Sequence, residues 1–212
     1  MIIDAISDLH GYYPKLEGGD LLIVAGDLTA RDNEPEYFNL LKKLCYEKYD
    51  KIILIAGNHD NCLQKDDFTI SWAIDSDDIF EYLCDSGTEF EGLKIWGSPW
   101  TKTFEGMNPH CKAFTVDSEE ELAGKFSLIP EDTDILITHS PPYGILDCTA
   151  HGPVGSIELN YAIAKTKARL IVFGHIHEQG GQVMDLIHTK FVNCSIVNEN
   201  YEHVNKPIRI VL

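Results

Sequence analysis

Five short apolar runs, each followed by a polar turn, constrain the fold of this chain more than any other feature. The runs are residues 2–6, 21–25, 52–56, 134–138 and 170–173. Continuous apolar runs of this length are typical of strands that are buried on both faces of a sheet. We therefore expect a core built on sheets, with a turn directly after each buried strand.

Helical patterns lie between these runs, at residues 34–49, 117–126 and 156–167. The apolar positions at helical spacing are Phe38, Leu41, Leu44 and Cys45 in the first pattern, and Ile157, Tyr161 and Ala164 in the third. Pro35 and the acidic residues near 117–121 suit the first turns of helices. Residues 88–96 suggest a hairpin, and the stretch from Gln182 onward suggests further strands.

The repeated order of strand, turn and helix predicts an α/β protein with helices outside buried sheets. A length of 212 residues fits one domain, which we expect to span residues 1–212. In α/β folds, ligands bind beyond the carboxyl ends of the strands. All five polar turns are at such ends, so we expect the functional groups to gather there.

Net charge and composition limit the classes of molecule that this chain is expected to bind. The chain has 34 acidic and 17 basic residues, a formal net charge of −17. This balance argues against long nucleic acids and against a polybasic membrane contact, because both need a basic surface. The sequence has no bilayer-length apolar run and no secretory leader pattern, and its six cysteines form no Cys-x-x-Cys pair. We expect a cytoplasmic protein with free thiols and no membrane partner; the oligomeric state stays open.

The turns supply side chains of the types that bind transition metals. They are Asp8, His10, Asp27, Asn58, His59, His139, His175 and His177. Carboxylate, amide and imidazole groups suit zinc, manganese or iron. A short Asp-x-His pair or a Gly-Asp pair alone is common in plain turns. The motifs at residues 57–60 and 174–177 are more specific, and the joint pattern across five strand ends is what indicates a metal site.

The joint pattern resembles that of the calcineurin-like metallophosphoesterases: Asp-x-His, Gly-Asp, Gly-Asn-His-Asp, a lone His and Gly-His-x-His, between residues 8 and 177. Residues 93–101, 129–142 and 172–178 further resemble the metallophosphoesterase domain-containing (MPPED) group. The resemblance implies a four-layer αββα sandwich of two mixed β-sheets. It also implies two divalent metal ions, with manganese favoured and iron, zinc, nickel or magnesium as alternatives.

The resemblance assigns the metal ligands residue by residue. Asp8, His10 and His177 would hold the first ion, Asn58, His139 and His175 would hold the second, and Asp27 would bridge the two. A bridging carboxylate offsets the repulsion between two cations, which together activate a bridging water and clamp the oxygens of an in-line displacement. His59 would be a catalytic group that faces the leaving oxygen, as general acid or as transition-state stabiliser, with Asp60 available to orient it.

Two further residues are candidates for substrate binding. Arg31 follows Asp27 by four residues, and a guanidinium suits phosphate, although a solvated surface arginine is the simpler interpretation. His110 lies in a long loop and could line a substrate pocket, or could be an exposed loop histidine.

The function expected from this resemblance is metal-dependent hydrolysis of a phosphate ester. We favour a phosphodiesterase that acts on a small, cyclic nucleotide-like substrate, because of the likeness to the MPPED group. A phosphomonoesterase is the alternative within the same chemistry. A non-catalytic scaffold with this fold is the alternative outside it, but a scaffold is expected to lose His59 or a ligand, and this chain keeps them all.

Overall fold

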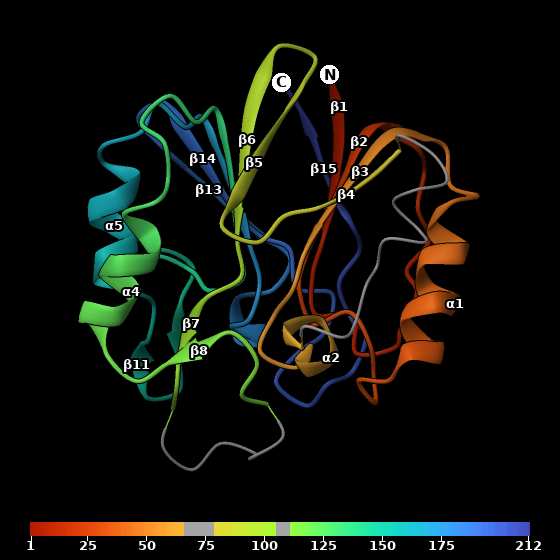
Figure 1. Cartoon of the computed structure of the whole chain (residues 1–212), viewed down its shortest axis with the longest axis horizontal. Coiled ribbons are helices and arrows are strands. Elements are labelled where there is room, and N and C mark those ends of the chain that lie inside the picture. Colours follow the sequence, from red (N-terminus) through yellow and green to blue (C-terminus); the bar gives the residue numbers. More distant parts are fainter. Residues whose placement is uncertain (66–78, 105–110) are drawn as a thin grey trace.

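Two β-sheets formed by the predicted apolar runs pack face to face at the centre of the molecule (Figure 1). The computed structural model describes residues 1–65, 79–104 and 111–212. The expected α/β architecture with two mixed sheets is confirmed, since each sheet combines parallel central strands with antiparallel edges.

The first sheet has the strand order β15-β1-β2-β3-β4. Its four parallel strands are β1 (Ile2–Ile6), β2 (Gly19–Ala25), β3 (Tyr49–Ile55) and β4 (Phe80–Tyr82). The edge strand β15 (Ile208–Val211) runs antiparallel to β1. The chain's last strand therefore lies beside its first, and both termini are at the same end of the molecule (Figure 1).

The second sheet has the order β13-β14-β12-β9-β6-β5. Its parallel strands are β6 (Leu93–Ser98), β9 (Ile135–Thr138), β12 (Leu170–Phe173) and β14 (Thr189–Asn193). The antiparallel edges are β5 (Ser86–Phe90), which forms the expected hairpin with β6, and β13 (Gln182–Leu186). Two short ladders complete the strands: β7 (Thr101–Lys102) with β8 (Thr115–Val116), and β10 (Cys148–Thr149) with β11 (Gly152–Pro153).

Helices cover the outer face of each sheet, which gives the four layers (Figure 1). They are α1 (Glu34–Leu44) over the first sheet and α4 (Glu119–Phe126) and α5 (Ile157–Ile163) over the second. The one-turn helix α2 (Asn61–Gln64) and the 3-10 helix η1 (His177–Gln179) follow strand ends. The longer helices begin at N-cap residues whose side chains accept backbone N–H groups. Ser118 and Glu121 form a capping box at α4, and Asn33 and Ser156 cap α1 and α5.

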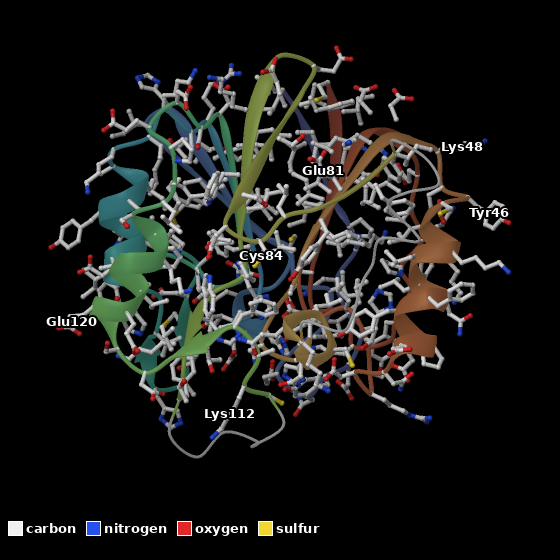
Figure 2. All side chains as sticks on the ribbon, in the orientation of Figure 1. Tyr46, Lys48, Glu81, Cys84, Lys112 and Glu120 are labelled. Carbon is white, nitrogen blue, oxygen red and sulfur yellow. The ribbon has the colours of Figure 1, made fainter. Side chains whose placement is uncertain are left out.

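The core lies in three apolar layers. Between the sheets, side chains such as Ile23, Ile53, Ile137 and Val172 are fully buried. Because successive side chains of a strand point to opposite faces, Val24 and Ile171 pack instead beneath the outer helices. Burial on both faces is what the continuous apolar runs predicted. Figure 2 shows side chains filling these layers, with Tyr46 beyond the end of α1 pointing outward.

Helix α5 buries a different face from the expected one, α1 buries the expected Leu41 and Leu44 but not Phe38 or Cys45, and all three helices are shorter than expected. In α1, Phe38 is 46% exposed, while Tyr37, Leu40, Leu41 and Leu44 are buried. In α5, Ile157 and Tyr161 are exposed, and Leu159 and Ala162 face the core beneath α4. Both helices carry apolar residues around much of their circumference, and packing against the sheet or α4 selects the buried side.

Among the described residues, no helix combines the length and apolar character that crossing a bilayer requires.

Candidate metal centre

The predicted ligands meet where the carboxyl ends of both sheets converge. Asp8, Asp27 and Asn58 follow β1, β2 and β3 of the first sheet, whereas His139 and His175 follow β9 and β12 of the second. This end of the molecule is opposite the termini, near α2 and the β7–β8 ladder (Figure 1). Parallel strands bring their ends to one edge, so residues far apart in sequence become neighbours.

A first cluster consists of Asp8, His10 and His177, whose ligand atoms all lie within 4.8 Å of one another. The Nε2 atom of His177 is 3.3 Å from Oδ1 of Asp8 and 3.4 Å from Nε2 of His10. Asp8 is fully buried, and its two oxygens also accept the backbone N–H of His175. These three side chains are the set that the resemblance assigned to one metal ion.

Asp27 lies between the first cluster and the histidines of the second sheet. Its Oδ2 atom is 3.7 Å from Nε2 of His10, and its Oδ1 atom is 3.4 Å from Nε2 of His139. The side chain is 2% exposed. The two oxygens of one buried carboxylate therefore face two different groups of ligands, which is the arrangement expected of a bridging residue.

The second group is centred on His139. Its Nε2 atom is 3.0 Å from Oδ1 of Asn58, and its ring centroid is 4.9 Å from that of His175. On the far side of His175, Thr101 Oγ1 lies 3.3 Å from Nε2, and the ring of Phe104 stacks at 5.9 Å. The structure thus brings all seven predicted ligands together at one place.

Four of the predicted ligands have a left-handed backbone conformation. Asp8, His10, Asp27 and His175 have φ values of 54°, 42°, 55° and 68°. This left-handed region is unfavourable for residues other than glycine, and strain of this kind clusters at functional sites. The strand-end turns therefore hold four of the seven predicted ligands in costly conformations.

Two motif glycines are required because side chains of the centre lie against them. A Cβ atom at Gly57 would collide with Oδ1 of Asp27, and one at Gly174 would collide with Oδ2 of Asp8 and Oγ of Ser7. Each glycine lets a strand end from one part of the chain approach a buried carboxylate. Close packing against these carboxylates thus explains why the Gly-Asn-His-Asp and Gly-His-x-His motifs have glycine at their first position.

The two buried aspartates stay ionised because histidines surround them. Burial alone would raise the pKa of Asp8, but the hydrogen bond and the charge of His177 lower this pKa well below its usual range. Burial would likewise raise the pKa of Asp27, but the charges of His139 and His59 lower it well below its usual range. Two buried carboxylates at one site require compensating positive charge.

The histidines divide into two kinds. Burial lowers the pKa of His10 to about 4 and that of His175 to about 3, so both rings are neutral at pH 7. For His139, burial would lower the pKa, but the charge and hydrogen bond of Asp27 raise it to about 9. Two imidazoles are thus already in the neutral form that binds metals, while His139 holds a proton that a cation would displace.

The donor set fits metal ions. The Nδ1 atom of His139 donates to the backbone carbonyl of Ala25 at 2.9 Å, which leaves Nε2 facing two oxygen atoms, from Asp27 and Asn58. A histidine that ligates a metal commonly donates its other N–H to a carbonyl in this way. A nitrogen lone pair facing oxygens is unfavourable unless a proton or a metal ion lies between them. The Nε2 atoms of His10 and His177 also face each other, so a proton or a metal ion is needed between these two nitrogens.

His59 lies beside the centre and is partly open to solvent. Its backbone N–H donates to Oδ1 of Asp27 at 2.9 Å, and its Nε2 atom is 3.8 Å from Oδ2 of the same carboxylate. The ring also meets that of His10, with centroids 4.7 Å apart. With 23% of its side chain exposed, His59 is accessible to a molecule that approaches the centre.

The Asp60 side chain is engaged differently from the expectation that it orients His59. Its oxygens accept the backbone N–H groups of Asp27, Leu28 and Gly57 and the hydroxyl of Tyr37, at 2.7–3.0 Å. Burial and the charge of Asp27 raise the pKa of Asp60 to about 7. Asp60 therefore fixes the turn that presents Asp27. The ring atom Nδ1 of His59 lies instead 3.4 Å from Sγ of Cys111.

The described contacts do not join Arg31, one of the two candidate substrate-binding residues, to the centre. The side chain of Arg31 is 83% exposed, lies 3.9 Å from Glu36 and lines a cavity of about 370 Å³ that residues 11–13, residues 28–31 and α1 form together. A solvated arginine was the simpler interpretation, and this placement agrees with it. His110 lies outside the described residues.

Tyr201, which has no motif context in the sequence, also contacts the centre. Its ring centroid is 4.8 Å from that of His10, 5.0 Å from that of His177 and 6.2 Å from that of His59. Tyr201 has a φ of 59° in a loop between β14 and β15. A single aromatic residue in a polar loop gives no periodic signal, so only the fold reveals this placement.

Comparison with known proteins extends these observations. The family model described as calcineurin-like phosphoesterase matches residues 1–179. The chain is 36% identical to human "Metallophosphoesterase domain-containing protein 1", over 98% of this chain and 69% of that protein. It is 34% identical to "UPF0046 protein T07D4.2" of Caenorhabditis elegans, over 92% of this chain. The chain spans about half, 54%, of the length of that nematode relative.

Among solved structures, the protein TT1561 of Thermus thermophilus superposes with a TM-score of 0.61. The alignment covers 92% of this chain and 88% of that chain, at 16% sequence identity. At this identity the likeness concerns the fold, and it agrees with the two-sheet architecture.

Proposed function

The chain belongs to the calcineurin-like phosphoesterase family, and from this premise we propose that it hydrolyses a small phosphodiester with two divalent metal ions. The observation that carries the proposal is the position of Asp27. One oxygen of this buried carboxylate faces His139 of the second sheet, and the other faces His10 of the first. A carboxylate shared between two ligand groups is what a dinuclear site requires.

The ligand groups divide between two ions. Asp8, His10 and His177 would hold one ion, Asn58, His139 and His175 would hold the other, and Asp27 would serve both. Two bound divalent ions would lower the pKa of a water between them and stabilise charge on the phosphoryl oxygens. Manganese is the favoured metal, and iron, zinc, nickel or magnesium would suit the same mixture of nitrogen and oxygen ligands.

His59 supplies the proton in this proposal. Its Nε2 atom lies 3.8 Å from Oδ2 of Asp27, and its side chain, 23% exposed, is more open to solvent than those of His10 and His177. A proton held at Nε2 would pass to the leaving oxygen of the ester as the bond to phosphorus breaks. The backbone hydrogen bond from His59 to Asp27 fixes the main chain at this position, and the thiol of Cys111 contacts Nδ1 of the ring.

Asp60 acts through the backbone. Its carboxyl group gathers three N–H groups from the turns that carry Asp27 and Gly57, and Tyr37 completes its hydrogen bonds. Asp60 is therefore a positioning residue for the bridging carboxylate. Replacing Asp60 would therefore displace Asp27, although all seven proposed ligand residues would still be present.

The net charge of −17 supports a small substrate. A long polyanion would meet an unfavourable field over most of the surface. Two divalent ions would reverse the charge locally and attract a small phosphate ester. The preference for a diester over a monoester rests on the likeness to the MPPED group, and the complete ligand set with His59 argues against a non-catalytic scaffold.

A substrate panel tests this function. The protein is loaded with Mn²⁺ and supplied with an aryl phosphodiester, the matching aryl phosphomonoester, and 2′,3′- and 3′,5′-cyclic nucleotides. We expect kcat/KM for the diesters to exceed that for the monoester. Faster hydrolysis of the monoester would replace the diesterase proposal by a phosphomonoesterase. No hydrolysis of any of them by folded, metal-loaded protein would favour the scaffold alternative.

A further inference from the structure

The loop of residues 198–203 is built to hold one aromatic ring over the metal centre. After β14 the chain passes from the second sheet to the first, where Ser195 pairs with Ser7 at the end of β1. A tight turn follows, in which the N–H of Tyr201 donates to the carbonyl of Asn198 at 2.9 Å. Val197 and His203 close the turn with a β-bridge. The loop is therefore anchored on both sides of Tyr201.

Tyr201 makes edge contacts with three histidines of the centre. Its ring meets His10 at an interplanar angle of 69°, His177 at 90° and His59 at 61°. His10 and His177 belong to the first ligand cluster, and His59 is the residue proposed to face the leaving oxygen. The tyrosine ring thus lies against the side of the centre that His10, His59 and His177 form.

The rest of Tyr201 is open. The residue is 47% exposed, a large value for a tyrosine that touches three buried or half-buried rings. Tyr12, which follows His10 by two residues, is 43% exposed and lies beside His203 with ring centroids 5.5 Å apart. Two exposed tyrosines therefore lie close to the first cluster, one in contact with His10 and one two residues after it. Exposed aromatic side chains beside a polar centre are typical of recognition surfaces.

We propose that Tyr201 is a specificity residue, which contacts a flat aromatic ring in the ester group that leaves the phosphate. This inference rests on the proposed function, because it places the leaving oxygen next to His59. The centroid of the Tyr201 ring is 6.2 Å from that of His59, so a substituent on an oxygen that His59 faces would come near the tyrosine ring. Rings pair with aromatic side chains in offset or edge-to-face arrangements at such distances.

The test measures binding rather than turnover. Benzylphosphonate and ethylphosphonate resist hydrolysis and share the charged group, but only the first has an aromatic ring. Their Kd values are measured by calorimetry on Mn²⁺-loaded protein. Because aromatic pairs add a modest free energy, we expect Tyr201→Asn to reduce the preference for benzylphosphonate by about two- to tenfold. Tyr201→Phe should keep the preference.

Asparagine is chosen because it tolerates the left-handed backbone at this position better than other residues with a side chain. Tyr46→Asn is the matched control, since Tyr46 is 78% exposed and points outward beyond α1 (Figure 2). The metal content of each variant shows whether the centre is intact.

The possible results separate the two proposals. If Tyr201→Asn binds metal and keeps the wild-type preference, the role of Tyr201 is wrong, while metal-dependent binding of ethylphosphonate still supports the proposed function. If the wild-type protein binds neither phosphonate with metal present, the proposed function is contradicted and the role of Tyr201 with it. An equal loss of preference in Tyr46→Asn would also overturn the inference.

Discussion

The Nε2 atom of His139 lies 3.4 Å from Oδ1 of Asp27, so that an imidazole at the end of one sheet faces a carboxylate at the end of the other. Both side chains are buried, and Asp27 also approaches His10 through its second oxygen. The metal centre is therefore a junction between the two halves of the sandwich. Binding of metal ions should couple the sheets as well as supply chemistry.

Replacing Asp27 tests the bridging role. Asp27→Asn keeps the size of the side chain but removes the charge that offsets two cations. We expect metal content to fall from about two ions per chain to below one, and hydrolysis to be lost with it. Elemental analysis after gel filtration measures the metal. Glu120→Gln, on the exposed side of α4, is the control. An Asp27→Asn protein that retains both ions would contradict the bridge.

Replacing His59 should separate catalysis from metal binding. His59→Ala removes the imidazole but none of the seven proposed ligands. We expect turnover of an aryl diester to fall by about 10²- to 10⁴-fold, the usual contribution of a general acid, with metal content unchanged. Steady-state kinetics and elemental analysis on the same sample measure both. Undiminished turnover would show that the proton comes from elsewhere, and joint loss of metal would show that His59 is a ligand.

A pair of glycine substitutions tests the packing of the centre. In Gly174→Ala the new methyl group collides with Asp8 and Ser7, so we expect weaker metal binding and a lower Tm. In Gly124→Ala, within α4, the methyl group meets open space. There we expect stabilisation by about 0.5–1 kcal/mol, because alanine favours helices over glycine. Thermal unfolding with and without Mn²⁺ measures both variants; equal behaviour would refute the close-packing argument.

The metal-free protein should lose stability as pH rises from about 6.5 to about 9. His139 has a folded pKa of about 9, above the ordinary imidazole value of 6.5. A raised pKa stabilises the fold fully below 6.5, and this contribution disappears as the pH passes the folded pKa. Thermal unfolding of chelator-treated protein across this range measures the effect.

Asp27→Asn provides the control for that pH dependence, because it removes the charge that raises the pKa of His139. Its metal-free stability should vary less between pH 6.5 and 9 than that of the wild type. A wild-type Tm that stays constant or rises over this interval would show that His139 does not hold its proton in the folded protein.

Much of the site follows from the sequence because strand ends are local features. Apolar runs such as residues 52–56 determine where a buried strand stops, and the next residues, Asn58 and His59 among them, must then lie at the sheet edge. Parallel strand order brings such edges together. The candidate ligands can thus be identified from short motifs, because each motif directly follows a strand that the sequence predicts.

Features that depend on tertiary partners were not predicted. In α5 the exposed Ile157 and the buried Leu159 are both apolar, and only packing against α4 distinguishes them. Asp60 was expected to orient His59, but its carboxyl group meets N–H groups from two separate turns. Tyr201 reaches the centre because the chain crosses between sheets after β14. None of these contacts leaves a periodic or motif signal.

The most direct test of the central claim is a titration of the chelator-treated wild-type protein with Mn²⁺, followed by the rate of hydrolysis of bis(4-nitrophenyl) phosphate. A centre in which Asp27 serves two ions predicts that hydrolysis appears with metal and saturates at about two equivalents per chain. Saturation at one equivalent, or folded protein that takes up no metal and stays inactive, would contradict the dinuclear phosphoesterase described above.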